Sequence, residues 1–265
     1  MRIIIAGGGT GGHLYPAIAV AEEIIKNDTS KKTKKSDILF VGTEQGIEKK
    51  VVPLEGYNIE FLKVEGFVGK SLKKKLRSLF LFALSFITAF RIIDRFRPKV
   101  VIGSGGYASL TMGLVAKVFD IPVVILEQNS IPGLANRIMG RFADAICVTY
   151  EESIERFPKS RIYHTGNPVR DGIFKGDAQR GVETFKIDKA KKTIFIFGGS
   201  LGAHAINRAI IDTLPYLLDL RLYIQFIHQT GEKDFEEVRS AYQKAGFQSV
   251  VEKYIYQMAD VYVIS

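Results

Sequence analysis

The sequence predicts an α/β protein made of two doubly wound, Rossmann-like domains in tandem, the second of them incomplete. Two observations support this. Short runs rich in Ile and Val alternate with helical stretches, which is typical of a parallel sheet covered by helices on both faces. A glycine-rich turn between a strand and a helix also occurs twice, at residues 7–12 and 198–203.

The first half contains six apolar runs of strand length, each flanked by Gly, Pro or Asp. They cover residues 2–6, 38–41, 59–62, 100–102, 123–126 and 145–148. Helices are expected between them, over residues 16–26 (with Pro16 in the first turn), 45–52, 72–96, 108–118, 134–141 and 150–156. Residues 165–192 are polar with little apolar period, so they indicate a linker. The first domain is therefore expected over residues 1–164.

The pattern restarts over residues 193–265, which we interpret as the second domain. Strands are expected at residues 193–197, 222–228 and 250–252, and helices at 204–218 and 234–244. Three clear strands are few for a doubly wound domain, and residues 263–265 show no helix that would cover the last edge. We therefore expect that the chain lacks the remainder of this domain.

Composition and charge indicate a soluble globular protein with one unusual segment. Apolar residues make up 46% and charged residues 25% of the chain. The only cysteine, Cys147, stands in an apolar run, which favours a buried thiol and a reducing compartment. A strand beginning at residue 2 leaves no room for a signal peptide. Of the net charge of +9, nearly all comes from residues 70–99, which hold nine basic residues and one acid. Because the positive charge is concentrated in this one segment, it indicates a partner that binds at this segment.

The two glycine turns are candidate anion sites. A strand that enters a helix through glycines places free backbone N–H groups and the positive end of a helix dipole at one point. No acidic residue ends the second strand to hold a ribose hydroxyl, so a dinucleotide fingerprint is disfavoured. The sequence also lacks a P-loop, a D-x-D motif and any Cys/His cluster with metal-ligand spacing.

Polar residues follow three of the expected strands at their carboxyl ends. His13 closes the first glycine turn and is a candidate base or ligand contact. Tyr107 follows the strand at 100–102, and Glu127 and Asn129 follow the strand at 123–126. Because parallel strands share their carboxyl edge, we expect these side chains to converge there.

Residues 70–99 place lysines and arginines on both sides of an apolar centre. Ser78–Phe90 contains no charge, but thirteen residues are too few to span a membrane. A core helix and a patch lying on an anionic bilayer are both compatible with this pattern, and they can coexist. Phe86, Phe90 and Ile93 are expected to face inward. The expected membrane patch comprises Lys73, Lys74, Lys75, Arg77, Leu79, Phe80 and Phe82. No motif supports nucleic-acid binding.

Five motifs together resemble the MurG family, within glycosyltransferase family 28. In chain order they read GGGTGGH (7–13), GSGGY (103–107), EQN (127–129), GNPVR (166–170) and GGSLGA (198–203). Their order and spacing make the resemblance specific, and it covers essentially the whole chain. It implies the GT-B architecture of two facing Rossmann-like domains. It also implies transfer of N-acetylglucosamine from UDP-GlcNAc to undecaprenyl-pyrophosphoryl-MurNAc-pentapeptide (lipid I), which gives lipid II.

The resemblance also implies roles for individual residues. His13 is the first candidate for the base that takes the acceptor's proton, and Glu127 is the second. The residues implied to bind substrate are Thr10, Gly11 and Gly12 beside the sugar diphosphate, Tyr107 on the acceptor side, Asn129 at the sugar, Arg170 and Ser200 at the nucleotide or its phosphates, and Ile255 on the uracil side. Transfer by direct displacement with inversion is implied, with backbone amides and a helix dipole stabilising the leaving UDP.

No cofactor and no metal is implied. The implied partners are UDP-GlcNAc, lipid I, the anionic inner-membrane surface and other proteins of cell-wall synthesis. The implied location is peripheral, on the cytoplasmic face of the bacterial inner membrane.

Two features depart from the family pattern. Leu126 stands where the family often has His, and the chain ends before the family's R-[SA]-G-A-x-T-x-x-E segment. The chain alone is therefore expected to be weakly active or inactive. Two alternatives stay open: a non-catalytic, membrane-associated acceptor-binding domain, and a related GT-B transferase with another lipid-linked acceptor.

Overall fold

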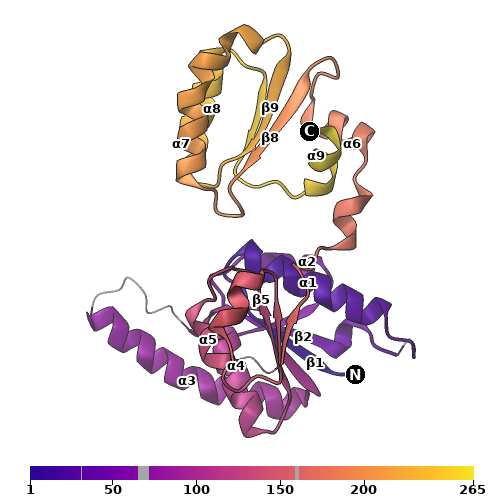
Figure 1. Ribbon diagram of the computed structural model, residues 1–265, viewed down its shortest axis with the longest axis vertical. Coiled ribbons are helices and arrows are strands. Elements are labelled where there is room, and N and C mark those ends of the chain that lie inside the picture. Colours follow the sequence, from indigo (N-terminus) through magenta and orange to yellow (C-terminus); the bar gives the residue numbers. More distant parts are fainter. Residues whose placement is uncertain (31, 65–71, 159–160) are drawn as a thin grey trace. The chain divides into compact units, whose positions relative to one another are not determined.

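The computed structural model describes residues 1–30, 32–64, 72–158 and 161–265, except for the side chains of residues 72–80. The described chain forms two compact units, Met1–Arg170 and Asp171–Ser265. Each unit has a parallel sheet of its own (Figure 1). The division between the units falls inside the polar segment 165–192.

The first unit is built on a seven-stranded parallel sheet of order β3-β2-β1-β4-β5-β6-β7. Its strands are β1 (Ile3–Ala6), β2 (Ile38–Gly42), β3 (Asn58–Phe61), β4 (Val100–Gly103), β5 (Val123–Glu127), β6 (Ala145–Val148) and β7 (Ile162–His164). β1 lies between β2 and β4, and Ala6 is level with Val41 and Gly103. The turns after these three strands therefore start at one edge of the sheet, where open α/β sheets bind ligands.

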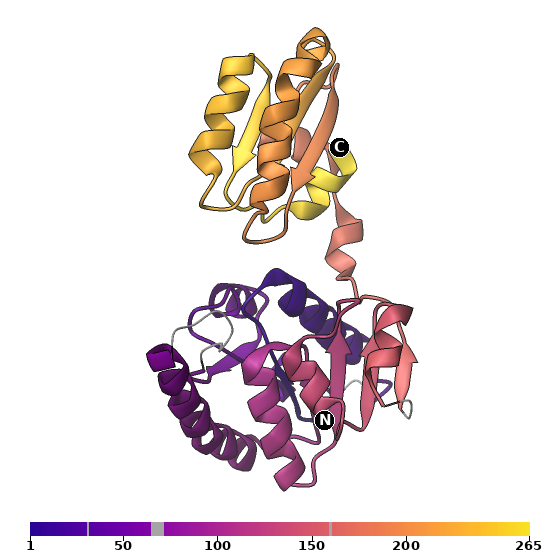
Figure 2. The ribbon, with the colours of Figure 1, turned by 60° about the vertical axis from the view of Figure 1, so that its left-hand side comes forward.

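Within the described residues, five α-helices cover the two faces of this sheet. They are α1 (Gly11–Lys26), α2 (Glu48–Leu54), α3 (Leu72–Phe96), α4 (Gly106–Val118) and α5 (Leu134–Met139). Along β1, Ile3 and Ile5 pack with α1 and α2, whereas Ile4 and Ala6 pack with α3, α4 and α5. α3 lies beside α4 on the same face (Figure 2). Because both faces are covered, the strands are apolar without alternation.

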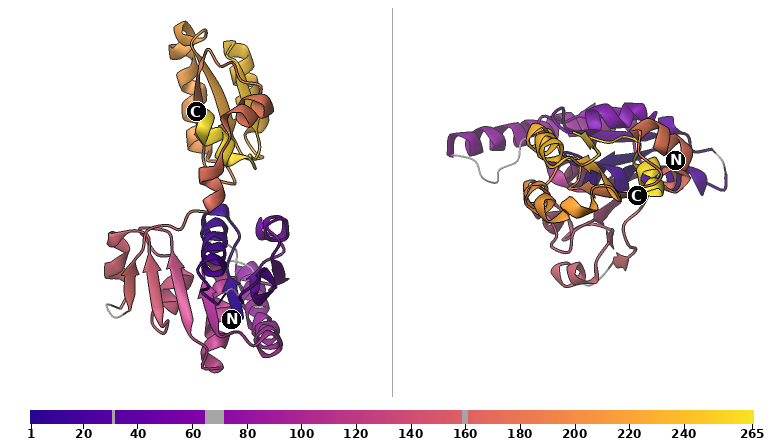
Figure 3. Two further views of the ribbon diagram at one scale, coloured as in Figure 1. Left: turned by 90° about the vertical axis from the view of Figure 1, so that its right-hand side faces the viewer. Right: turned by 90° about the horizontal axis from the view of Figure 1, so that it is seen from above.

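The second unit holds a three-stranded parallel sheet of order β10-β9-β8. Its elements are α6 (Ala178–Phe185), β8 (Lys192–Phe197), α7 (His204–Thr213), β9 (Ile224–Gln229), α8 (Phe235–Ala245), β10 (Ser249–Glu252) and α9 (Met258–Ile264). Phe226 of β9 packs with α7 and α8, whereas Ile227 packs with Phe185 of α6 and Val261 of α9. The two pairs of helices thus lie on opposite faces of the sheet (Figures 1 and 3).

The nine predicted strands are all present, with ends within two residues of the predicted positions. β7 was not predicted, because it is three residues long and largely exposed and therefore carries little apolar signal. α1 begins five residues earlier than expected, so Pro16 lies inside the helix and not in its first turn. Gly11 and Gly12 have low helix propensity, which hid the first turn from the sequence pattern. Cys147 is half-buried, and its burial raises the pKa of the thiol.

Two expectations about the second half are wrong. Part of the expected linker is α6, and the last residues form α9 where no helix was expected. Asp260 of α9 accepts hydrogen bonds from the backbone N–H of Asp177 and from Arg180, and so joins the two helices. Each helix is short and depends on the other for its buried face, so neither has a strong pattern of its own. The helix expected at residues 150–156 is the 3₁₀-helix Glu151–Arg156. The helix expected at residues 204–218 is α-helical only over α7, and the chain continues as the 3₁₀-helix Leu214–Leu220.

Candidate functional site

The first glycine turn leads from β1 directly into α1. Gly9 has a φ of +84°, and a Cβ atom at this position would meet nothing within 4 Å. The Thr10 carbonyl accepts hydrogen bonds from the N–H groups of His13 (3.3 Å) and Leu14 (3.1 Å). Thr10 is the N-cap residue, and Gly11, Gly12 and His13 form the first turn of α1. The positive end of α1 therefore lies at the carboxyl edge of the sheet, as an anion site requires.

His13 lies between the glycine turn after β1 and the turn after β4, which contains Gly105. Its Nδ1 atom lies 3.3 Å from the Gly8 carbonyl oxygen. A carbonyl oxygen only accepts, so Nδ1 is the donor and Nε2 carries the lone pair. A Cβ on Gly105 would lie 3.0 Å from Nε2, so the glycine at this position gives the ring its space. The geometry leaves Nε2 of His13 suited to act as a base.

A cavity of about 540 Å³ opens between these turns. Its walls come from the turns after β1, β2 and β4 and from Val64 after β3, and it is open to solvent on one side. The lining residues are Gly7, Gly8, Gly9, Thr43, Gln45, Gly46, Val64, Gly105, Gly106, Tyr107 and Ala108. Tyr107 thus reaches the cavity beside the start of α4. A volume of this size suits a diphosphate-bearing ligand group.

Glu48 is a buried acid at this site that the sequence analysis did not single out. It is the first residue of α2 and only 1% exposed. Its carboxylate accepts hydrogen bonds from the N–H groups of Gly9 (2.8 Å) and Thr43 (2.8 Å), and from the Thr43 hydroxyl (2.9 Å). The only signal in the sequence is an acid two residues after a glycine, in a segment expected to be helical, which is too common to be informative.

Glu127 organises the loop after β5. It is 2% exposed, and Oε1 accepts hydrogen bonds from the backbone and side-chain amides of Asn129, both at 2.9 Å. Oε2 accepts from the Asn136 side chain (2.9 Å) and from the Gly133 N–H (3.3 Å). Because both oxygens are occupied in this way, the geometry favours His13 over Glu127 as the base. Asn136, which the sequence analysis missed, also donates to the Leu126 carbonyl.

Arg170 is the last residue of the first unit. Its guanidinium stacks over the Tyr15 ring, 4.1 Å from the centroid, and pairs with Glu55 at 3.0 Å. Arg170 thus has two partners in the first unit.

The second glycine turn follows β8 and lies against the turn after β9. Gly202 and Gly231 both have positive φ, and a Cβ on Gly202 would lie 1.9 Å from the Thr230 carbonyl oxygen. Only glycine allows the two turns to approach so closely. Ser200 lies on the turn, three residues before the N-cap of α7.

Gln229 links this turn to the chain after β10. Its side chain is 3% exposed, donates to the Gly199 carbonyl (2.9 Å) and accepts from the Ile255 N–H (2.7 Å). The Ile255 side chain is 2% exposed and packs in the core. The side chain of Ile255 is therefore not available to contact a uracil ring. Only the backbone of Ile255 is available for such a contact.

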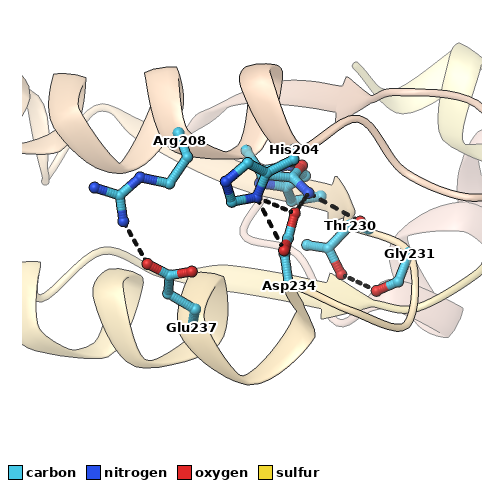
Figure 4. Close-up of polar contacts among 8 residues, drawn as sticks. His204, Arg208, Thr230, Gly231, Asp234 and Glu237 are labelled. Atoms are coloured by element: carbon cyan, nitrogen blue, oxygen red, sulfur yellow. Dashed lines mark hydrogen bonds and ion pairs between the residues drawn. The ribbon is translucent and has the colours of Figure 1, made fainter.

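A network of polar side chains supports the second turn from behind (Figure 4). Asp234 accepts hydrogen bonds from His204 (3.1 Å) and Asn207 (2.8 Å), and Asn207 also donates to the Thr230 carbonyl. His228 is fully buried between Asn207 and Tyr242, each at 3.1 Å. Burial lowers the pKa of His228 to about 4, so the imidazole is neutral near pH 7. On the exposed side, Arg208 pairs with Glu237 (Figure 4).

The described part of α3 exposes an apolar face. Leu84, Ile87 and Phe90 are each between 42% and 53% exposed and lie three residues apart. Ile93 is buried as expected and Phe86 packs against the core, but Phe90 is half-exposed, contrary to expectation. Phe82 is only partly buried and packs against the core. The side chains of the other expected patch residues lie outside the described residues: Lys73, Lys74, Lys75, Arg77, Leu79 and Phe80.

Neither a metal-ligand cluster nor a membrane-spanning helix is present within the described residues. In residues 1–30, 32–64, 72–158 and 161–265, no three His, Cys, Asp or Glu side chains come together as a metal site would require. Over the same described residues, no helix is long and apolar enough to cross a membrane.

The fold and the two glycine turns define the class of protein. It is a GT-B protein, with two Rossmann-like domains that each present a glycine-rich turn at the carboxyl edge of a sheet. The chain belongs to glycosyltransferase family 28. Residues 3–148 match the N-terminal domain of that family and residues 193–264 match its C-terminal domain. The resemblance drawn from the five motifs is confirmed.

The curated relatives carry one particular name. A protein of Thermodesulfovibrio yellowstonii is 45% identical over the whole chain, which spans 71% of that relative. One of Myxococcus xanthus is 41% identical over 99% of the chain and 66% of the relative. Both are named UDP-N-acetylglucosamine–N-acetylmuramyl-(pentapeptide) pyrophosphoryl-undecaprenol N-acetylglucosamine transferase. The chain is thus about two thirds to seven tenths as long as these two relatives.

Solved structures agree with the family assignment. MurG of Acinetobacter baumannii superimposes with a TM-score of 0.65 at 26% identity, covering 100% of this chain and 71% of that one. UDP-GlcNAc 2-epimerase of Neisseria meningitidis, solved with UDP-GlcNAc, has a TM-score of 0.69 at 17% identity, covering 99% and 74%. At 17% identity the likeness to the epimerase shows a shared fold alone.

Proposed function

We propose that the chain transfers N-acetylglucosamine from UDP-GlcNAc to undecaprenyl-pyrophosphoryl-MurNAc-pentapeptide, forming lipid II. The observation that carries the proposal is the 45% identity over the whole chain to a relative named for this reaction. The site geometry agrees with it. A histidine whose Nδ1 faces the Gly8 carbonyl stands beside a cavity lined mainly by glycines, with Tyr107 among the other lining residues.

His13 is the proposed base. Its Nε2 atom takes the proton from the acceptor sugar's hydroxyl as that oxygen attacks the anomeric carbon, and UDP leaves from the opposite face. This single displacement inverts the configuration. The acceptor's diphosphate group lies in the 540 Å³ cavity, near the positive end of α4 and beside Tyr107. Thr10, Gly11 and Gly12 are proposed to lie beside the sugar diphosphate.

The second unit holds the donor. The glycine turn after β8 and the N-terminus of α7 offer backbone N–H groups to the diphosphate of UDP-GlcNAc, with Ser200 beside them. The same groups stabilise the charge that develops on the leaving UDP. Asn129, held by Glu127, is proposed to contact the transferred sugar, and Arg170 reaches the nucleotide after leaving Tyr15 and Glu55.

Contact with an anionic membrane surface on the cytoplasmic face is part of the proposal. The acceptor named for the relatives is a polyprenol-linked molecule. Nine basic residues lie within residues 70–99. Leu84, Ile87 and Phe90 add an exposed apolar face to the same helix. Together they suit a helix that lies on a bilayer with its basic end at the headgroups.

The test of the proposed function is transfer by the His13→Gln variant. Single-turnover transfer of labelled GlcNAc to a lipid I analogue is measured with protein in excess, so that slow transfer is also detected. We expect the rate to fall about 10²–10⁴-fold, the contribution typical of a general base. UDP-GlcNAc binding, measured by calorimetry, stays unchanged.

His164→Gln is the matched control, because His164 is an exposed histidine at the end of β7. We expect this variant to transfer at the rate of the unaltered chain. Transfer by His13→Gln at that same rate would refute the role of His13. Absence of any transfer by the unaltered chain, with both substrates at saturation, would contradict the proposed function.

A further inference from the structure

One peptide group connects Glu48 to His13. The peptide that joins Gly8 and Gly9 donates its N–H to Glu48 Oε2 at 2.8 Å. The carbonyl of the same peptide accepts from His13 Nδ1 at 3.3 Å. A carboxylate and an imidazole therefore lie at opposite ends of one planar group. Hydrogen bonds in such a chain polarise one another, so each strengthens the next.

The surrounding structure fixes Glu48 at its end of this chain. Three glycines from two turns leave room for the carboxylate. A Cβ on Gly8 would lie 2.4 Å from its carboxyl carbon, one on Gly42 2.5 Å from its Cγ, and one on Gly46 1.9 Å from Oε2. Thr43 donates twice to Oε1, so Oε2 is left to hold Gly9. The arrangement gives the Gly8–Gly9 peptide a single orientation, with its carbonyl aimed at His13.

The orientation of this peptide decides which nitrogen of His13 carries the proton. With the Gly8 carbonyl at Nδ1, the ring is held as the Nδ1–H tautomer and Nε2 keeps its lone pair. A rotated peptide would offer its N–H to Nδ1 instead and would favour the opposite tautomer, which cannot accept a proton at Nε2.

We propose that Glu48 is a positioning residue that sets the tautomer of His13 through the Gly8–Gly9 peptide. A carboxylate that holds a catalytic histidine directly is a familiar arrangement, and here a peptide group stands between the two. The catalytic consequence rests on the proposed function, whereas the tautomer itself does not. When the acceptor hydroxyl gives its proton to Nε2, an imidazolium forms and Nδ1 keeps its hydrogen. Glu48 stays a carboxylate, and its charge stabilises the imidazolium through the polarised peptide.

The test reads the His13 tautomer by ¹⁵N NMR of the imidazole in the free protein at neutral pH. The signal is assigned by its loss in His13→Gln. In the unaltered chain we expect a protonated Nδ1 and an unprotonated Nε2. In Glu48→Ala the Gly9 N–H loses its acceptor, and we expect a mixture of the two neutral tautomers. An Nε2–H tautomer in the unaltered chain, or an unchanged spectrum in Glu48→Ala, would overturn the proposal.

Thr43→Val is the matched control. It removes the hydroxyl that donates to Oε1 but leaves the bond between Glu48 and Gly9, so we expect the tautomer of the unaltered chain. A mixture of tautomers in this control would show that any loosening of the turn suffices, which would overturn a specific role for Glu48. If Glu48→Ala does not fold, Glu48→Met, which fills the space of the side chain but offers no oxygen to the Gly9 N–H, replaces it in the same measurement.

Kinetics separate this proposal from the proposed function. We expect transfer by Glu48→Ala to fall about 10–100-fold, as when a residue that orients a functional histidine is lost, with KM for UDP-GlcNAc unchanged. Suppose that Glu48→Ala shows the expected mixture of tautomers but neither the unaltered chain nor any variant transfers the sugar. This result would support the role of Glu48 and contradict the proposed function. An unchanged tautomer together with full transfer by Glu48→Ala would overturn the role of Glu48 and leave the proposed function intact.

Discussion

Single buried amides hold the binding turns of the second unit in place. Gln229 binds both the Gly199 carbonyl and the Ile255 N–H. It therefore connects the turn proposed to bind the diphosphate of UDP with the stretch expected to lie beside the uracil. Gln225, four residues earlier on β9, makes a similar pair of bonds to the backbone of Asp188. The two glutamines are equally buried but lie at opposite ends of the strand.

Replacing Gln229 by Met therefore separates stability from binding. The variant leaves a buried carbonyl and a buried N–H unpaired, which costs about 1–3 kcal/mol for each group. We expect weaker UDP binding by calorimetry as well as a lower free energy of unfolding. Gln225→Met, the control, is expected to lose stability by a similar amount and to keep its UDP affinity. Equal loss of UDP affinity in both variants would show that only stability is affected.

The buried His228 gives the second unit a dependence on pH. Burial lowers its pKa from the ordinary 6.5 to about 4. Between these values the unfolded chain binds a proton that the folded chain does not, so stability falls as the pH is lowered through this window. The loss is at most about 3–4 kcal/mol, at about 1.4 kcal/mol per pKa unit.

Hydrogen exchange of residues 171–265 between pH 7 and pH 4 measures this dependence. We expect protection to fall with pH in the unaltered chain and the fall to be smaller in His228→Gln. His164→Gln, which removes an exposed histidine from the first unit, is expected to leave the dependence unchanged. Equal slopes in the unaltered chain and in His228→Gln would disprove the role of His228.

Among the elements, α3 differs most from an ordinary core helix. One face supplies Ala89, Ile92 and Ile93 to the core, while Leu84 and Ile87 remain exposed. The sequence shows both the apolar centre and the basic flanks, but it assigned Phe90 to the wrong face. A helix apolar over much of its circumference has no clear boundary between its two faces, and only its packing against α4 sets the rotation.

Removing the basic charge from the start of α3 tests the membrane contact. Each lysine near an anionic surface contributes roughly 1 kcal/mol, so the triple change Lys73, Lys74 and Lys75 to Ala is expected to weaken binding about 100-fold. Sedimentation with vesicles of anionic phospholipid measures this affinity. The effect should shrink at high salt. The control changes Lys189, Lys191 and Lys192 to Ala. If both triple variants bind equally weakly, net charge alone attracts the chain.

At the scale of the whole molecule, each unit has a core of its own. The first unit packs two apolar clusters on the two faces of its sheet, and the second unit does the same with different residues. No residue belongs to a cluster of both units within the described residues. Units with separate cores unfold as separate cooperative domains.

We therefore expect two unfolding transitions in calorimetry. Ile92→Ala in the first core and Ile227→Ala in the second each remove a buried side chain, at a cost of about 2–5 kcal/mol. Each variant should lower one transition and leave the other in place. A single transition that both variants shift would show that the units unfold together.

The sequence predicts the positions of nine strands along the chain well, because strands buried on both faces of a sheet must be apolar throughout. It predicts α6 and α9 poorly, because their pairing depends on Asp260, a residue 80 positions from its partner Arg180. The glycine turns and His13 are visible in the sequence because they lie together in it. Glu48, Asn136 and Gln229 are not, because each acts on backbone groups from turns that only the fold brings close.

The sequence by itself determined the family and the class of fold. Five motifs in fixed order and uninterrupted apolar strands can be recognised along the chain without knowing how the chain packs. Only the tertiary structure shows how the carboxylates of Glu127 and Glu48 and the ring of His13 are held. Glu127 and Glu48 are both carboxylates beside glycine turns. Both carboxylate oxygens of Glu127 accept hydrogen bonds from amide groups. The carboxylate of Glu48 instead accepts from the Gly8–Gly9 peptide, whose carbonyl faces His13. The direction of a hydrogen bond depends on where a donor and an acceptor come to lie, and only the folded chain sets that.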